Sequence, residues 1–337
     1  MLPTFRTAAV AAAFAIPVWT ASFAPAALFD AAHVSAEAKW VLHYDVDASR
    51  ATAYGKKFHQ EHVATEKGQE KLAWVRDRYG IDLEKDLHGF TAYGNNYQPH
   101  SGVLLMHSKF DASKIEAVVK DEAGYRTSRH GNHVIHAWTA KHGKPGEEGA
   151  AQAAGHPVAA ALVESRVMVI AGTEAGVKSA LDVLDGKAKN LQGARSPLVF
   201  DVPAGTFFQG AAFSLTDLKT RPRPFPILQE SNSARMTFGE SAGKTSFSFD
   251  LDTGSMQRAK QVATMVEGLK AMLALQAEAR VELAPIAQGL TVKQADSAVE
   301  IDWNVATDAV MKLGEKIRAE RDARRAQREA AGEKRDD

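Results

Sequence analysis

The feature that most constrains the fold is an order of strand and helix patterns that occurs twice along the chain. In the first half, residues 40–46 alternate as a strand, and a helical region with a break around Gly68 runs to Tyr79. Strands at about 88–93 and 103–107, a helix over 114–121, hairpins over 125–138 and 158–171, and a helix over 173–185 follow. This order of segments is typical of an α+β unit.

The second half repeats the order over shorter segments. Residues 205–215, 234–239 and 245–251 match the three strands, a helix over about 257–276 follows, and a hairpin over 290–303 ends the half. In this alignment Trp303 takes the place of Trp138, at equivalent ends of two hairpins. The pattern predicts an α+β fold made by tandem duplication of a strand-helix-strand-strand-helix-hairpin unit, with antiparallel sheets and helices packed on one face.

The N-terminal segment is typical of a secretory signal peptide. Arg6 precedes an uncharged run, residues 7–29, with an alanine-rich core that Pro17 breaks. Ala24 and Ala26 supply the small residues of a cleavage site. Because the run consists largely of Ala, Ser, Thr and Pro, it is a weak membrane anchor, although a retained anchor stays the alternative. The segment predicts a periplasmic or secreted protein whose mature chain has no transmembrane helix.

These patterns divide the chain into four parts. Residues 1–26 are the signal peptide, 38–190 the first α+β repeat and 197–313 the second. Residues 314–337 form a charged tail in which acids and bases alternate, and which we expect to be a solvated helix that becomes partly disordered.

Charge and cysteine content exclude several classes of function. Lys plus Arg and Asp plus Glu are both 41, so no basic excess is present to neutralise phosphates, and nucleic acid is not expected as a partner. The chain has no cysteine, which rules out disulfides, Cys-ligated zinc, thiol catalysis and a lipid-modified N-terminal cysteine. Stability must therefore come from packing.

One apparent catalytic motif is better explained as a turn. Residues 239–243 match G-x-S-x-G, the nucleophile elbow of α/β-hydrolases, with Ser241 in the serine position. That chemistry needs a downstream histidine, but all 12 histidines lie between His33 and His156. The residues after the motif alternate like a strand. We interpret Ser241 as a hairpin-turn residue, and no phosphate loop fits either, because position 238 is Phe238.

The uneven distribution of histidines gives the main candidates for chemistry. His130 and His133 flank the turn Gly131-Asn132 and should face each other across the hairpin, where two imidazoles can chelate zinc or copper weakly. Further ligands would come from His142, Asp121 or Glu122. His59 and His62 also have a chelating i, i+3 spacing. Ordinary solvated histidines are the alternative for all of these.

A second candidate site lies on the first strand. Alternation places Trp40, Leu42, Tyr44 and Val46 on one face, and His43, Asp45 and Asp47 on the other. With His107 from a neighbouring strand, the polar face would form a cluster suited to acid–base catalysis. A solvent-facing sheet surface explains the same pattern.

Three segments resemble those of uncharacterised exported bacterial proteins of similar length. They are residues 40–47, residues 79–89, which contain Tyr79-Gly80-Ile81-Asp82 and Asp86-Leu87-His88-Gly89, and residues 180–187. The resemblance covers most of the mature chain and includes no catalytic motif. It implies export and the architecture, and no activity.

The sequence therefore favours an exported envelope protein that acts as a non-enzymatic binding or structural module, with an envelope protein or small ligand as its partner and no cofactor. The alternative is a weak divalent-metal-binding protein that uses His130 and His133. An unrecognised hydrolase is the third hypothesis.

Overall fold

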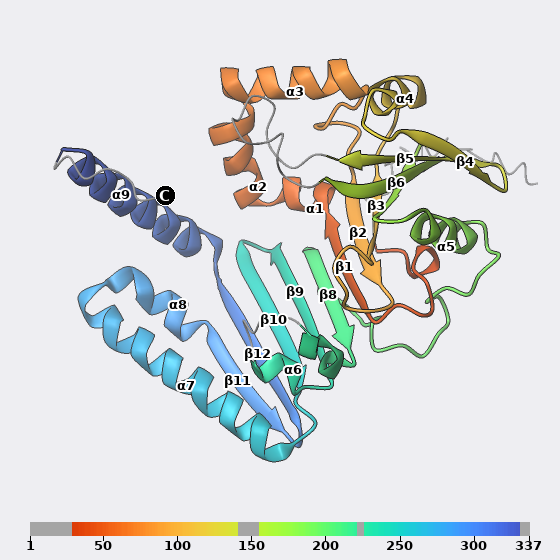
Figure 1. Cartoon of the computed structure of the whole chain (residues 1–337). Coiled ribbons are helices and arrows are strands. Elements are labelled where there is room, and N and C mark those ends of the chain that lie inside the picture. The colour runs from red at the N-terminus through yellow and green to blue at the C-terminus, as the bar shows by residue number, and fades with distance from the viewer. Residues whose placement is uncertain (1–28, 141–154, 221–225, 331–337) are drawn as a thin grey trace, which may run out of the picture.

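Twelve strands of the described residues form one antiparallel sheet (Figure 1). The computed structural model describes residues 29–140, 155–220 and 226–330. The α+β class is thereby confirmed. The signal peptide predicted at residues 1–26 and the end of the charged tail, residues 331–337, lie outside these ranges.

The strands agree closely with the sequence patterns and include every predicted hairpin. Their bounds are β1 Trp40–Asp45, β2 Gly89–Gly94, β3 Val103–His107, β4 Arg126–His130, β5 His133–Ala140, β6 His156–Val163, β7 Val167–Ala171, β8 Thr206–Phe213, β9 Ser233–Ser241, β10 Lys244–Asp252, β11 Leu290–Ala295 and β12 Ala298–Ala306.

The helical segments include several short turns beside the longer helices. Their bounds are η1 Ala31–His33, α1 Val46–Ala51, α2 Ala53–Phe58, η2 His59–Val63, α3 Glu66–Tyr79, α4 Ala112–Lys120, α5 Glu174–Leu184, η3 Leu215–Thr220, α6 Pro226–Gln229, α7 Met256–Ala279, η4 Val281–Leu283, α8 Ala284–Gln288 and α9 Thr307–Ala330. In the described ranges, no helix combines the length and hydrophobicity needed to span a membrane.

The two halves share one sheet because β1 pairs with β8, with Tyr44 opposite Phe208. The prediction of separate sheets is therefore wrong. From this junction the strand order runs outward as β1-β2-β3-β7-β6-β5-β4 in the first half and β8-β9-β10-β12-β11 in the second. The first five positions of both series show the same pattern: three strands in chain order, then the last strand of the half, then the strand that precedes it in the chain. Duplication stays a prediction. If the halves are aligned by this strand order, β12 takes the position of β7 and β11 the position of β6.

The expected equivalence of the two tryptophans is wrong. Trp138 lies in β5, opposite Val158 of β6, whereas Trp303 lies in β12, between β10 and β11. The sequence alignment treated the last hairpin of the second half as the counterpart of β4–β5. Because β4 and β5 form the far edge of the first half, they have no matching strands in the second.

The first hydrophobic core covers one face of the sheet in the first half. Val41, Leu105 and Val169 project from the strands and pack with Val177 and Leu181 of α5. Residues of η1 and of the 190–198 loop complete this layer. All five of these side chains are 2% exposed or less, so this is the best buried part of the described chain.

The second core lies on the opposite face of the same sheet. Leu251 and Val299 pack there against Ala259 and Val262 of α7. The change of face is visible in β8, where Ala211 belongs to the first core, while its neighbour Ala212 pairs with Ala234 of the second. Adjacent strand residues point to opposite faces. The prediction of helices on one face is therefore wrong for the sheet as a whole.

Helix α9 connects the two halves through ion pairs. Glu315 pairs with Lys57, and Arg318 with Glu61 at 2.7 Å, both in the first half. Lys316 pairs with Glu282 at 2.6 Å and Glu320 with Arg280 at 2.8 Å in the second. The tail predicted at 314–337 is thus helical as far as Ala330, and its alternating charges contact both halves.

We expect Val41→Ala to destabilise the protein by about 2 kcal/mol and Leu42→Ala by less than about 1 kcal/mol. The reason is that Val41 is 2% exposed and Leu42 is 41% exposed. Urea unfolding of the two variants measures the difference. A larger loss for Leu42→Ala would show that the face of β1 is assigned incorrectly.

Candidate functional site

A cavity of about 360 Å³ lies between β1, the helices α1–α3 and the loop before β2. Most of its lining is apolar or aromatic. The apolar and aromatic lining residues are Tyr44, Val46, Tyr54, Phe58, Val63, Leu72 and Leu83, and the remaining ones are Ser49, Arg50, Gly55, His59 and Glu84. Such a volume and lining are typical of a site for a small ligand.

Helix caps in the sequence create the enclosure. Asp45 accepts a hydrogen bond from the amide of Ala48 and begins α1, Thr52 caps α2, and Thr65 caps α3. At each cap the chain changes direction, so the helical segments bend around the cavity. The sequence predicted one helical region with a break at Gly68, but Gly68 lies within α3. Helix α3 ends at Tyr79, as predicted, and Gly80 caps it in a left-handed conformation.

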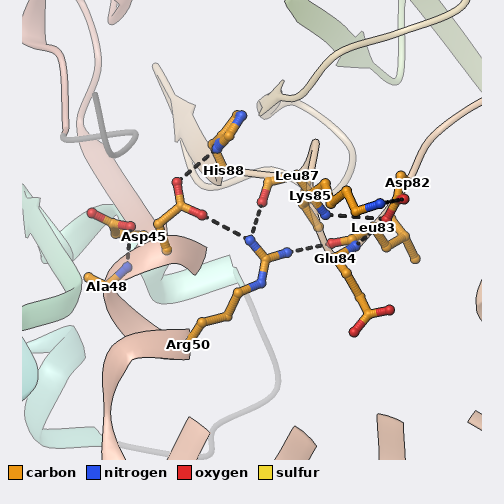
Figure 2. A network of polar contacts seen from close by, with 10 residues as sticks. Asp45, Ala48, Arg50, Asp82, Leu83, Glu84, Lys85, Leu87 and His88 are labelled. Carbon is orange, nitrogen blue, oxygen red and sulfur yellow. Dashed lines mark hydrogen bonds and ion pairs between the residues drawn. The ribbon is translucent and has the colours of Figure 1, made fainter. Parts of the chain in front are cut away.

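Arg50 fixes the wall of the cavity (Figure 2). Its guanidinium donates to Asp47 at 2.9 Å, to the carbonyl oxygen of Leu87 at 2.8 Å and to that of Leu83. Asp47 also contacts Nδ1 of His88 at 2.8 Å. These contacts attach the loop of residues 80–88 to α1. The positive charge of Arg50 is therefore matched within the protein.

Polar groups at the rim are also paired with each other. His59 contacts Glu84 at 2.7 Å, and the hydroxyls of Tyr44 and Ser49 are 2.6 Å apart. Tyr54 and Phe58 are 60% and 50% exposed at the mouth of the cavity. Sequence reasoning missed this site, because its lining comes from segments whose contacts are set by the fold.

The structure brings His43, Asp45 and His107 to one sheet face, and that face is buried. His43 and Asp45 are each 4% exposed, whereas Leu42 is 41% exposed, so the interpretation of the polar face as a solvent-facing surface is wrong. These polar side chains can be buried because each has a hydrogen-bond partner nearby. His43 contacts the hydroxyl of Thr91 at 2.9 Å, and Asp45 caps α1. Asp47 lies outside the strand, in α1.

His107 is largely enclosed beneath η1. Its ring stacks on that of His33, with centroids 6.0 Å apart and an interplanar angle of 16°. Burial lowers the pKa of His107 to about 4, and the neighbouring His33 and His43 add to this effect. His107 is thus neutral near pH 7 and is positioned as a packed core residue.

His130 and His133 lie directly opposite each other in the β4–β5 hairpin, as predicted. Each ring contacts its own carboxylate near the end of α5, His130 with Asp182 at 2.7 Å and His133 with Asp185 at 2.9 Å. Asp185 also accepts from Lys187 at 2.7 Å. The carboxylates in contact with these rings are thus Asp182 and Asp185, and not Asp121 or Glu122, which the sequence suggested as further ligands. His142, the other suggested ligand, lies outside the described residues.

Metal binding at this hairpin stays a prediction. Within the described ranges, no group of three or more His, Asp or Glu side chains is arranged to hold a metal ion. His59 and His62 do not converge either, because His59 contacts Glu84 and His62 packs against Phe58. A divalent ion at His130 and His133 would have to replace two carboxylate contacts.

The structure confirms that Ser241 is a hairpin residue. It ends β9 and pairs with Lys244 of β10 across a turn in which Ala242 and Gly243 both have positive φ, 50° and 73°. A nucleophile elbow requires a helix after the serine, and here a strand follows. The hydrolase hypothesis therefore receives no support from this motif.

A second cavity, of about 340 Å³, is lined by charged residues of the outer strands β9–β12. Arg235, Asp250, Glu300 and Lys293 occupy consecutive positions across four strands. Burial raises the pKa of Asp250, and Glu300 and Asp302 raise it further. The two bases flank the two acids, so this row is close to electrically neutral, and the lining of this cavity includes no aromatic side chain.

Comparisons with known proteins identify no family for this chain. No protein-family model matches the sequence, and no curated protein matches it. Crystal form III of TP0453 is similar in structure, with a TM-score of 0.43, 7% identity, and coverage of 85% of this chain and 97% of that chain. Crystal form I of TP0453 has a TM-score of 0.40 with the same identity and coverage. No feature of the site is inferred from this likeness.

Stability should fall as the pH falls from 6.5 toward 4, because the unfolded chain binds a proton at His107 in this window and the folded chain does not. We expect His107 to account for a loss of ~2 kcal/mol between pH 7 and pH 5. Urea unfolding of the wild type and of His107→Phe at both pH values measures this. Equal losses in the two proteins would contradict it.

Proposed function

We propose that this chain is a non-enzymatic binding module of the bacterial envelope that holds a small, mostly apolar ligand in the cavity between β1 and α1–α3. The observation that carries the proposal is the lining of this cavity, in which Tyr44, Tyr54 and Phe58 supply aromatic surface. Its volume of about 360 Å³ is within the range of small-molecule sites.

The charges around the cavity indicate the chemistry of the ligand. Arg50 is neutralised by Asp47 and bound to two backbone carbonyls, so it offers no free cation to an anionic group. His59 and Glu84 satisfy each other at the rim. A neutral aromatic or aliphatic group therefore fits better than a phosphate or a carboxylate, which would have to displace these contacts.

The position of the titratable residues supports a non-enzymatic role. Tyr44 lines the cavity, whereas the adjacent His43 and Asp45 project from the other face of β1 and are buried there. His43 and Asp45 are thus separated from the cavity by the sheet, and Asp47 is engaged by Arg50 and His88. The signal peptide predicted at residues 1–26 supports a periplasmic or secreted location for this module.

We expect the neutral fluorescent probe N-phenyl-1-naphthylamine to bind the chain from Ala27 to Asp337, and Val63→Trp to weaken this binding at least about tenfold by filling the cavity. Leu72→Trp should act in the same direction. Fluorescence titration measures the affinity, and circular dichroism checks that both variants are folded.

Trp74→Ala is the matched control. Trp74 is 55% exposed on α3 and does not line the cavity, so its removal should leave the affinity unchanged. Equal affinities for the wild type and both filled variants would refute the proposal.

A further inference from the structure

Helix α7 exposes a row of large apolar side chains. Met265, Leu269, Met272 and Leu275 are 63%, 47%, 50% and 67% exposed. The helix packs on the sheet through Ala259, Val262 and Val266, so these four side chains point elsewhere. Figure 1 shows α7 at the outer edge of the second half, in cyan. Exposed apolar surface of this extent indicates an interaction site.

The same helix face carries no charge. Between residues 261 and 279, the other residues on it are Gln261, Thr264, Gly268, Gln276 and Ala279. Glu267, Lys270 and Glu278 fall on the opposite side of the helix, at about 3.6 residues per turn. An uncharged face can pair with an identical face without charge repulsion, because a twofold axis brings the same surface patch of both copies together.

The order of residues along this face is also nearly symmetric about its midpoint. Around the midpoint between Gly268 and Leu269, Met265 is matched by Met272, and Gln261 by Gln276. In an antiparallel pair of α7 helices, each methionine would meet the other methionine of the second copy. Each glutamine would face a glutamine, and an amide both donates and accepts hydrogen bonds.

Gly268 lies at the centre of this face and points to a close backbone approach. A Cβ added there would meet nothing within 4 Å in the described chain. Glycine in a helix interior is destabilising relative to alanine, so the fold of one copy gives no reason for it. A second helix that crosses at this point could come close to α7, because Gly268 has no side chain to keep it away.

We propose that a second copy of this chain docks on α7 in antiparallel orientation, with a twofold axis beside Gly268 and Leu269. A lipid surface fits less well. Helices that lie on membranes are rich in Lys and Arg on the polar face, with Trp, Phe or Leu on the other. The segment has Arg258, Lys260 and Lys270 against Glu267 and Glu278, and no aromatic residue. This inference is independent of the proposed ligand, whose cavity lies in the first half.

The absence of cysteine permits a direct test in the chain from Ala27 to Asp337. Gly268→Cys should form an intermolecular disulfide rapidly under mild oxidation, because the twofold axis brings the two residues 268 together. Trp74→Cys is the control at another exposed apolar position and should not. Equal cross-linking of the two variants would overturn the proposal.

Sedimentation equilibrium tests the association without a covalent bond. We expect the wild type to dimerise reversibly, Leu269→Glu to weaken the dimer at least about tenfold, and Trp74→Glu to leave it unchanged. Gly268→Leu should raise the melting temperature of the diluted monomer through helix propensity while weakening the dimer. Two results would overturn the proposal. One is a wild type that stays monomeric, and the other is vesicle binding, abolished by Leu269→Glu, with no change in oligomeric state.

Discussion

The pairing of β1 with β8 determines most of the structure. It joins the two halves into one sheet, and the alternation of side chains then continues without interruption across both of them. The first half buries one face beneath η1 and α5, and the second half buries the other beneath α7. As a result β1 has a different environment on each side. Tyr44 borders the ligand-sized cavity, while His43 and Asp45 project from the opposite face and are buried there.

Local features of the fold could be predicted from the sequence, and long-range ones could not. The turn at Gly131-Asn132 and the end of the helical region at Tyr79 each depend on a few neighbouring residues, and both are observed. The single sheet depends on contacts between segments distant in the sequence. The face of β1 is the clearest case, because the apolar residues Trp40, Leu42 and Tyr44 outnumber those on the face that is buried. Hydrogen bonds with Thr91 and Ala48 make burial of His43 and Asp45 possible, and no local pattern reveals these partners.

The contrast between local and long-range contacts also explains which parts of the candidate sites could be predicted. Facing positions of His130 and His133 follow from hairpin geometry, so the sequence places them correctly. Their partners Asp182 and Asp185 come from α5, which packs nearby only in the folded chain. The cavity is harder still to predict from the sequence, because its lining comes from β1, the four helical segments α1, α2, η2 and α3, and a loop. The signal that identifies it is the series of caps at Asp45, Thr52 and Thr65, which divides one helical region into segments that surround a space.

The central position of β1 also affects how the chain must be made. β1 is the first of the described strands in chain order, and one of its two neighbours, β8, follows only after the rest of the first half. Until then the backbone N–H and C=O groups along that side of β1 have no strand to pair with. An open edge of this kind is a template for strands of other chains. Intermolecular pairing therefore competes with folding until β8 has joined β1, and protection of β1 during this interval is a requirement of the topology.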